Sequence, residues 1–313
     1  MTNPMAGGLA VLALAAATAS GQRTPVFRAG LDLVNVTVTV RDGQGGLVSD
    51  LAAEDFVVRE DGRPQALEIF APAALPAERE ELALNLGMLF DTSESMRKDL
   101  KLSQESAIRF LEAIPRARDL LLIFFDRDIR ISRYNSENQQ GIFGRILEAK
   151  GEGFTALYDA IAVYLSRVAE TPGRKVLVVF TDGDDTTSQV PPQEVQRLLR
   201  SSDATVYPVA FPGQHNRNSS EALRARAFLY SLAELSGGRV FQPTASRELA
   251  AIYQSILDEL GTQYVLGYVS DNAKRDGKFR RITVELKRPG LKVRHRTGYD
   301  APRDEPPKPP KKK

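Results

Sequence analysis

Apolar and polar positions along the chain follow two different periods. Residues 31–40 alternate between apolar and polar side chains, which is typical of a strand with one buried face. Between residues 82 and 260, continuous apolar runs instead alternate with segments whose apolar residues recur with the period of a helix. Alternation returns beyond Gly261. The pattern therefore predicts β-strands at both ends of the chain and an alternating strand–helix region between them.

The middle region is expected to form an α/β fold with a doubly wound sheet. Strands are expected at residues 82–91, 119–125, 175–181, 205–211 and 239–241, with 129–133 as a hairpin after the second of them. Helices are expected at residues 98–114, 139–149, 156–169, 192–201, 220–236 and 247–260. Because strands and helices alternate in this order, they predict a mostly parallel sheet with helices on both faces.

The flanking strands are few at each end. They are expected at residues 31–40, 56–60 and 66–70 before the middle region, and at 263–270, 279–287 and 291–296 after it. A sheet of two or three strands is only marginally stable by itself. We therefore expect the flanks, residues 26–75 and 263–300, to pair into one β-sandwich, with the α/β region, residues 82–262, inserted between them. Two separate small β-appendages remain the alternative.

The N-terminal residues have the composition of an export signal. Met5 to Ala19 is apolar and uncharged, and Ala17-Thr18-Ala19 provides small residues for cleavage. We therefore expect residues 1–20 to be a signal peptide, and the mature chain to be exported to the periplasm or the exterior. No Lys or Arg precedes the apolar stretch, and a disordered Ala-rich leader is the alternative. No transmembrane span is expected in the mature chain, because no other stretch is long and apolar enough.

Charge and cysteine content exclude several classes of function. The formal net charge of +2 is too small to indicate a nucleic-acid partner. Residues 301–313 are rich in Pro and Lys, so we expect them to form a disordered basic tail. The chain has no cysteine, which excludes disulfides, thiolate catalysis and Cys-based zinc sites.

Small oxygen-bearing side chains follow the ends of predicted elements. Asp91, Ser93 and Ser95 come after one apolar run, Asp182 comes after another, and Thr155 opens a helical segment. The carboxyl ends of parallel strands meet at one edge of the sheet, where such folds place their ligands. Oxygen-only ligation suits a hard divalent cation, Mg²⁺ first and Mn²⁺ or Ca²⁺ next. Each segment alone is also compatible with helix capping, but the three together favour a metal site.

These residues also carry a family resemblance. Asp91-x-Ser93-x-Ser95, Thr155 in Gly-Phe-Thr-Ala-Leu and Asp182 in Phe-Thr-Asp-Gly-Asp resemble the metal-ion-dependent adhesion site of the von Willebrand factor type A family. The resemblance covers residues 82–262. It implies that Ser93 and Ser95 bind the metal directly, that Thr155 binds directly or through water, and that the two aspartates act largely through water. It also implies non-catalytic adhesion, in which an Asp or Glu carboxylate of a protein partner completes the coordination.

The flanks resemble a narrower group, the exported relatives of this family that are often found in acidobacteria. The segments that carry this resemblance are 36–42, 51–61, 263–268, 276–280, 287–291 and 298–299. The resemblance supports export and the two-part architecture.

The sequence lacks the residue patterns that several classes of enzyme require. Phosphatases with an aspartyl nucleophile place a second Asp two residues on, where this chain has Ser93. No Gly-x-Ser-x-Gly or Gly-x-x-x-x-Gly-Lys-Ser/Thr segment occurs, and His215 and His295 are expected to be solvated. We therefore expect a non-enzymatic binding module. The alternatives are a scaffold whose sandwich makes the contacts while the metal only stabilises, and a hydrolase that uses the metal as a Lewis acid.

The C-terminal strands carry many basic residues between residues 274 and 296. We expect their charged side chains to face water, while Ile282, Val284, Leu286 and Val293 face a core. A face that binds polyanions is the alternative.

Overall fold

The computed structural model describes residues 33–72, 84–113, 119–134, 141–212, 219–243 and 248–304. The predicted signal peptide, residues 1–20, and most of the predicted tail lie outside these ranges.

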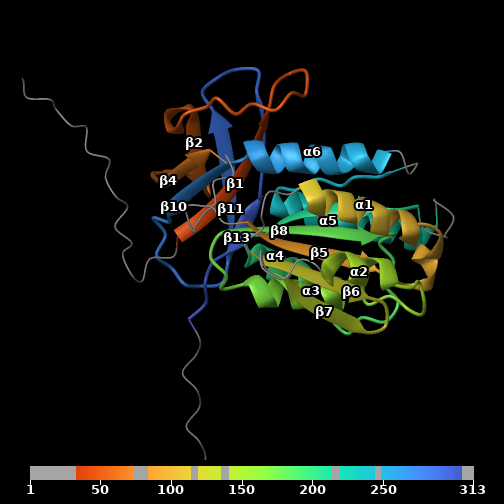
Figure 1. Cartoon of the computed structure of the whole chain (residues 1–313). Coiled ribbons are helices and arrows are strands. Elements are labelled where there is room, and N and C mark those ends of the chain that lie inside the picture. Colours follow the sequence, from red (N-terminus) through yellow and green to blue (C-terminus); the bar gives the residue numbers. More distant parts are fainter. Residues whose placement is uncertain are drawn as a thin grey trace, which may run out of the picture. The chain divides into compact units, whose positions relative to one another are not determined.

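The centre of the α/β region is a five-stranded mixed sheet in the order β7-β6-β5-β8-β9 (Figure 1). Its strands are β5 (Leu84–Asp91), β6 (Asp119–Phe125), β7 (Ile129–Tyr134), β8 (Arg174–Thr181) and β9 (Thr205–Ala210). Four of them are parallel, and β7 joins β6 as an antiparallel hairpin. Every residue of the four parallel strands is buried, which explains why they are continuous apolar runs rather than alternating ones.

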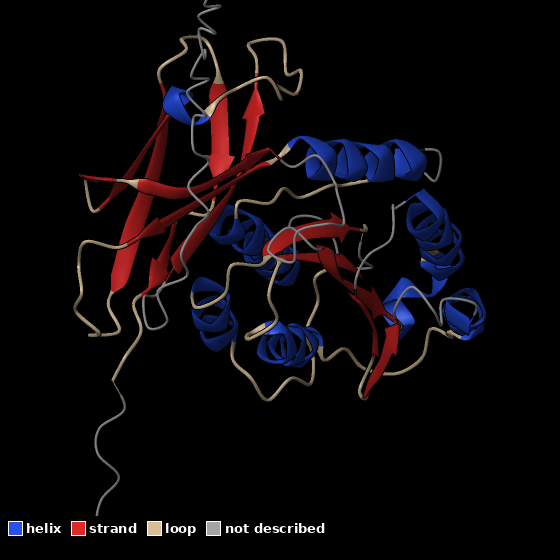
Figure 2. Ribbon diagram, turned by 60° about the vertical axis from the view of Figure 1, so that its left-hand side comes forward, coloured by secondary structure: helices blue, strands red, loops and turns tan. Residues whose placement is uncertain are grey.

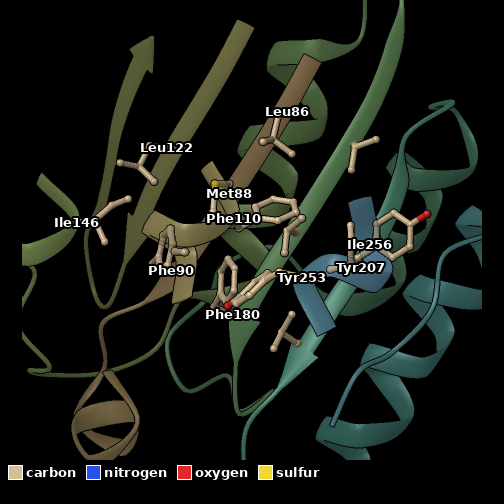
Figure 3. Close-up of a cluster of buried hydrophobic side chains, with 14 of the residues drawn as sticks. Leu86, Met88, Phe90, Phe110, Leu122, Ile146, Phe180, Tyr207, Tyr253 and Ile256 are labelled. Atoms are coloured by element: carbon tan, nitrogen blue, oxygen red, sulfur yellow. The ribbon is translucent and has the colours of Figure 1, made fainter. Parts of the chain in front are cut away.

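Helices cover both faces of this sheet (Figure 2). One face packs against α1 (Leu100–Ala113), α2 (Ile142–Glu148) and α6 (Leu249–Thr262). The other packs against α3 (Leu157–Val168), α4 (Pro192–Arg200) and α5 (Ser220–Ser236). Figure 3 shows the first of these two cores, where Phe110 and Tyr253 of the helices meet Phe90 and Phe180 of the strands. The expected doubly wound α/β fold is confirmed.

The flanks of the chain form two antiparallel sheets with a common core. One sheet has the order β12-β1-β10-β4, and the other has the order β13-β11-β2-β3. The strands are β1 (Leu33–Arg41), β2 (Phe56–Glu60), β3 (Arg63–Gln65), β4 (Leu67–Pro72), β10 (Tyr264–Val269), β11 (Phe279–Leu286), β12 (Lys292–His295) and β13 (Gly298–Asp300). Each sheet combines strands from both ends of the chain, because β1 pairs with β10 and β12, and β2 pairs with β11. This pairing contradicts the alternative of two separate appendages.

Several details differ from the predictions. The segment 239–241, expected to be a strand, makes only one bridge, between Phe241 and Val209. The short strands β3 and β13 were not predicted, because three residues are too few to show a period. Residues 301–304 are not part of a disordered tail: Ala301 N–H donates to the carbonyl of Lys278, and Asp304 N–H donates to the carbonyl of Arg275. The remainder of that predicted tail, residues 305–313, lies outside the described residues.

Most basic residues of the C-terminal strands are exposed as expected, but two arginines are buried. Arg280 is 4% exposed and forms an ion pair with Glu60, which is 3% exposed. Arg296 is buried as well, and donates to the carbonyls of Gly298 and Arg200. The expectation that these charges face water was therefore wrong for both arginines. Buried arginines are held by such partners, because an unpaired buried charge costs too much free energy.

Candidate metal centre

Neighbouring strand ends place the two predicted aspartates together. Asp91 is the last residue of β5, and Asp182 follows β8 directly. The strands pair in parallel with Phe90 opposite Phe180, whose rings stack with centroids 4.6 Å apart. Both aspartates are buried, with exposed fractions of 1% for Asp91 and 7% for Asp182.

The first segment is folded so that its oxygens converge. Asp91 Oδ1 accepts a hydrogen bond from the backbone N–H of Ser93 at 3.0 Å. Its Oδ2 accepts one from the hydroxyl of Thr181 at 2.7 Å. The hydroxyl oxygens of Ser93 and Ser95 are 3.0 Å apart. Ser93 itself is buried and precedes the short helix Glu94–Lys98.

The Thr155 segment lies between the other two segments. On one side, Glu94 N–H donates to the carbonyl of Gly153 at 3.2 Å. On the other side, the backbone of Thr155 donates to Thr186 Oγ1 at 2.9 Å and accepts from the backbone N–H groups of Thr186 and Thr187. The structure thus brings all three predicted segments to one edge of the sheet.

The site has a deficit of positive charge. Burial, together with the negative charge of Asp182, raises the pKa of Asp91 to about 7. Asp182 Oδ1 accepts a hydrogen bond from the backbone of Asp184 at 3.1 Å, whereas its buried Oδ2 has no hydrogen-bond partner among the residues that the structure describes. Two buried carboxyl groups next to hydroxyl groups fit a hard divalent cation. Such a cation would neutralise the buried negative charge and be coordinated by Asp182 Oδ2.

Hydroxyl groups are essential to this donor set. Among the residues that the structure describes, no group of three or more His, Cys, Asp or Glu side chains could hold a metal ion. A site of Asp91 and Asp182 with Ser93, Ser95 and Thr155 is of another kind, in which two carboxylates are supplemented by three hydroxyls.

Sequence reasoning missed several residues around the site. The hydroxyl of Thr181 donates to Asp91 and orients its carboxylate. In the sequence, only the position of Thr181 directly before Asp182 pointed to a role at the site. Asp99 lies near enough that burial, and then the charge of Asp182, raise its pKa. Asp126 follows β6, so the strand-end rule could have found it. Its carboxylate accepts from Arg130 at 2.6 Å and lies 3.1 Å from the hydroxyl of Thr92.

Two other sequence expectations concern residues outside the donor set. His295 was expected to be solvated, which was wrong. Its Nε2 accepts from Val284 N–H at 3.2 Å, its Nδ1 lies 2.6 Å from the Arg296 carbonyl, and burial lowers its pKa. His215 lies outside the described residues.

Comparisons with solved structures give weak similarity over long stretches. A von Willebrand factor type A protein from Catenulispora acidiphila is 12% identical with a TM-score of 0.48, covering 89% of this chain and 76% of that chain. An aerotolerance-related membrane protein from Bacteroides fragilis is 15% identical with a TM-score of 0.45, covering 57% of this chain and 98% of that one. The pilus adhesin SpaC from Lactobacillus rhamnosus GG is 8% identical with a TM-score of 0.49, covering 72% of this chain and 44% of that one.

A curated relative and a family model extend the comparison. A UPF0353 protein from Nocardia farcinica is 20% identical over 217 residues, which are 60% of this chain. The match spans 65% of that relative, less than two thirds of its length. Within the described part of the chain, no helix combines the length and apolarity that crossing a membrane requires.

The model of the von Willebrand factor type A domain matches residues 85–255, more than half of the 313 residues. The chain therefore belongs to the von Willebrand factor type A domain family.

Proposed function

We propose that this protein is an exported, non-enzymatic binding module. It holds a divalent cation, Mg²⁺ or alternatively Mn²⁺ or Ca²⁺, at a site formed by Asp91, Ser93, Ser95, Thr155 and Asp182. The bound cation would supply positive charge and an open coordination position for an Asp or Glu carboxylate of a protein partner. Domains of this family are typically adhesion or protein-interaction modules, which supports binding rather than a reaction.

The observation that carries this proposal is the buried Oδ2 of Asp182, which has no hydrogen-bond partner within the described part of the chain, together with the raised pKa of Asp91. Buried polar atoms normally have a partner, so an orphaned carboxylate oxygen indicates a group that completes the site. The hydrogen bonds from Thr181 and Ser93 hold the Asp91 carboxylate in one orientation. The chain therefore contributes a preorganised set of oxygens.

The test is thermal unfolding of the protein with EDTA and with each cation. A ligand at one hundred times its dissociation constant stabilises the folded state by about 2.7 kcal/mol. We expect Mg²⁺ to raise the melting temperature of the wild type and of Glu94→Gln, a matched control whose exposed carboxylate lies between the two serines. Asp182→Asn should lose this rise while remaining folded. A wild-type protein with no response to any of the three cations would contradict the proposal.

Export is the second part of the proposal and has its own test. The apolar stretch from Met5 to Ala19 and the small residues at its end support it. Expression of the full chain in a bacterial host should yield an exported product whose mass corresponds to loss of about the first twenty residues. An uncleaved product that stays in the cytoplasmic fraction would count against export without affecting the metal site.

A further inference from the structure

Phe154 is an exposed apolar residue in the loop that carries Thr155 of the candidate metal centre. It is 60% exposed, more than any other large hydrophobic residue in the described part of the chain. It directly precedes Thr155, one of the five proposed ligands. Single exposed apolar residues are common on protein surfaces and need no explanation. The position of this one, and the way its backbone is held, carry the inference.

The backbone on both sides of Phe154 is fixed by hydrogen bonds to separate loops. Before it, Glu152 N–H donates to the carbonyl of Thr92 at 2.8 Å, and the Gly153 carbonyl accepts from Glu94. After it, Thr155 is bonded to Thr186, and Ala156 N–H donates to the carbonyl of Asp126 at 2.8 Å. Since its neighbours are held on both sides, Phe154 loses little conformational freedom when a partner binds.

Gly153 sets the turn that presents this side chain. Its φ of +80° lies in the left-handed region, which glycine adopts without strain. Nearby charges are satisfied by one another: Arg97 forms an ion pair with Glu94 at 3.4 Å and donates to the carbonyl of Gly151. An exposed bulky apolar residue next in sequence to a proposed ligand, in a loop whose charged neighbours are already paired, is suited to an anchoring contact at a protein interface.

We propose that Phe154 determines which acidic segments this protein binds. This inference rests on the proposed function, because the metal must first take the partner's carboxylate. The partner is a protein segment in extended conformation, with an Asp or Glu and a large apolar side chain two positions away. Residues i and i+2 of an extended chain point to the same side, about 7 Å apart. The carboxylate reaches the metal while the apolar side chain packs on Phe154.

The experiment is selection from a displayed peptide library with a fixed central Asp or Glu and random flanking positions, in Mg²⁺. Four proteins are compared: wild type, Phe154→Ser, Ser93→Ala and Phe279→Ser. The last is a control of the same residue type, because Phe279 is 42% exposed on β11 of the sandwich. We expect the wild type and the control to enrich apolar residues two positions from the acid. Phe154→Ser should retain EDTA-sensitive, acid-dependent binding without that enrichment, and Ser93→Ala should lose binding.

The affinity of an enriched peptide gives the second readout. Burial of a Phe side chain against an apolar partner corresponds to roughly a tenfold to hundredfold change in affinity, which Phe154→Ser should remove. This inference would be overturned if the peptides selected by the wild-type protein showed no preference for apolar residues, or if Phe154→Ser selected the same residues as the wild type. Either result would leave the proposed metal function standing. Binding that is insensitive to EDTA and unaffected by replacing the fixed acid with Asn or Gln would overturn both.

Discussion

At the scale of single residues, Asp91 and Asp182 show how burial creates a need for a cation. Both carboxylates lie at strand ends with almost no exposed surface. Removal of water disfavours the charged form of Asp91, and repulsion from the negative charge of Asp182 adds to this effect. The pKa of Asp91 is consequently raised from 3.8 to about 7. Without a cation, the folded protein thus holds a proton at a pH where the unfolded chain has released it.

The stability of the metal-free protein should therefore depend on pH in a defined direction. Because the folded-state pKa of Asp91 is above its unfolded value, its contribution to stability is present at low pH and is lost as pH rises towards about 7. Between pH 5.5 and pH 8, we expect the free energy of unfolding in EDTA to fall by about 2 kcal/mol from this residue. Saturating Mg²⁺ should reverse the trend, because the cation binds the deprotonated form.

The measurement is urea unfolding of the wild type and of Asp91→Asn at both pH values. Burial lowers the pKa of His295, so that residue makes stability rise with pH in both proteins. The difference between the two proteins isolates Asp91. Equal pH slopes in EDTA would mean that Asp91 is already ionised in the folded protein.

Gly87 illustrates a second constraint on a single residue. A Cβ atom added to Gly87, in the middle of β5, would lie 2.2 Å from the ring of Tyr164, which is fully buried on α3. Overpacking of this kind typically costs 1–3 kcal/mol, so Gly87→Ala should lower the free energy of unfolding by about that amount. Gly144→Ala is the control, since nothing lies within 4 Å of its Cβ position in α2. The control should leave stability unchanged or raise it by up to about 1 kcal/mol in urea titration.

At the scale of elements, α6 is the connection between the two parts of the chain. It ends at Thr262, and β10 begins two residues later at Tyr264. Its Glu259 is fully buried and forms ion pairs with Arg41 of β1 at 2.6 Å, with Arg294 of β12 and, at 3.5 Å, with Arg239. A helix of the α/β region is thereby held by two strands of the sandwich.

Glu259→Gln should be strongly destabilising. The substitution keeps the shape of the side chain but leaves the arginines without their anion, and removal of one partner of a buried ion pair costs about 3–5 kcal/mol. Because the arginines are partly exposed, we expect the lower part of that range. Glu234→Gln on the exposed face of α5 is the control and should change the free energy of unfolding by less than about 0.5 kcal/mol. Similar values for the two variants would show that solvent replaces Glu259 at little cost.

At the scale of the whole molecule, the sandwich and the α/β region share buried polar contacts. Gln263 donates to the hydroxyls of Tyr207 in β9 and Thr39 in β1, and it accepts from Arg174 at 2.6 Å. These residues are buried, so separation of the two parts would expose their polar groups to water or leave them without hydrogen-bond partners. The two parts should therefore unfold together.

This cooperativity can be measured by calorimetry. The wild type should show one transition, which Mg²⁺ moves to higher temperature as a whole. The double variant Gln263→Ala with Glu259→Gln removes both sets of contacts described above, and we expect it to separate the transition into two, of which Mg²⁺ raises only the one of the α/β region. Two transitions already present in the wild type would show that the shared contacts do not couple the parts.

Local pattern alone determined the elements around the site and the five candidate ligands. The buried strands are continuous apolar runs, and Asp91 and Asp182 are recognisable because polar residues interrupt those runs where a strand must end. The helix Ser220–Ser236 was predicted with its observed bounds, because Gly237-Gly238 marks its end in the sequence. The structure adds that the Ser219 side chain caps its start and that Gly237 has a φ of +76°.

Tertiary structure decided what depends on distant partners. The pairing of β1 with β10 joins segments more than 200 residues apart, and no periodicity records such a register. Arg280 and His295 look like solvated residues in the sequence, yet Arg280 is buried with Glu60, and His295 is half-buried and accepts a hydrogen bond from Val284. The approach of Asp99 to Asp182 likewise arises only in the fold. Periodicity reports which face a residue shares with its neighbours along the chain, whereas burial of a charge is decided by the partner that the fold brings to it.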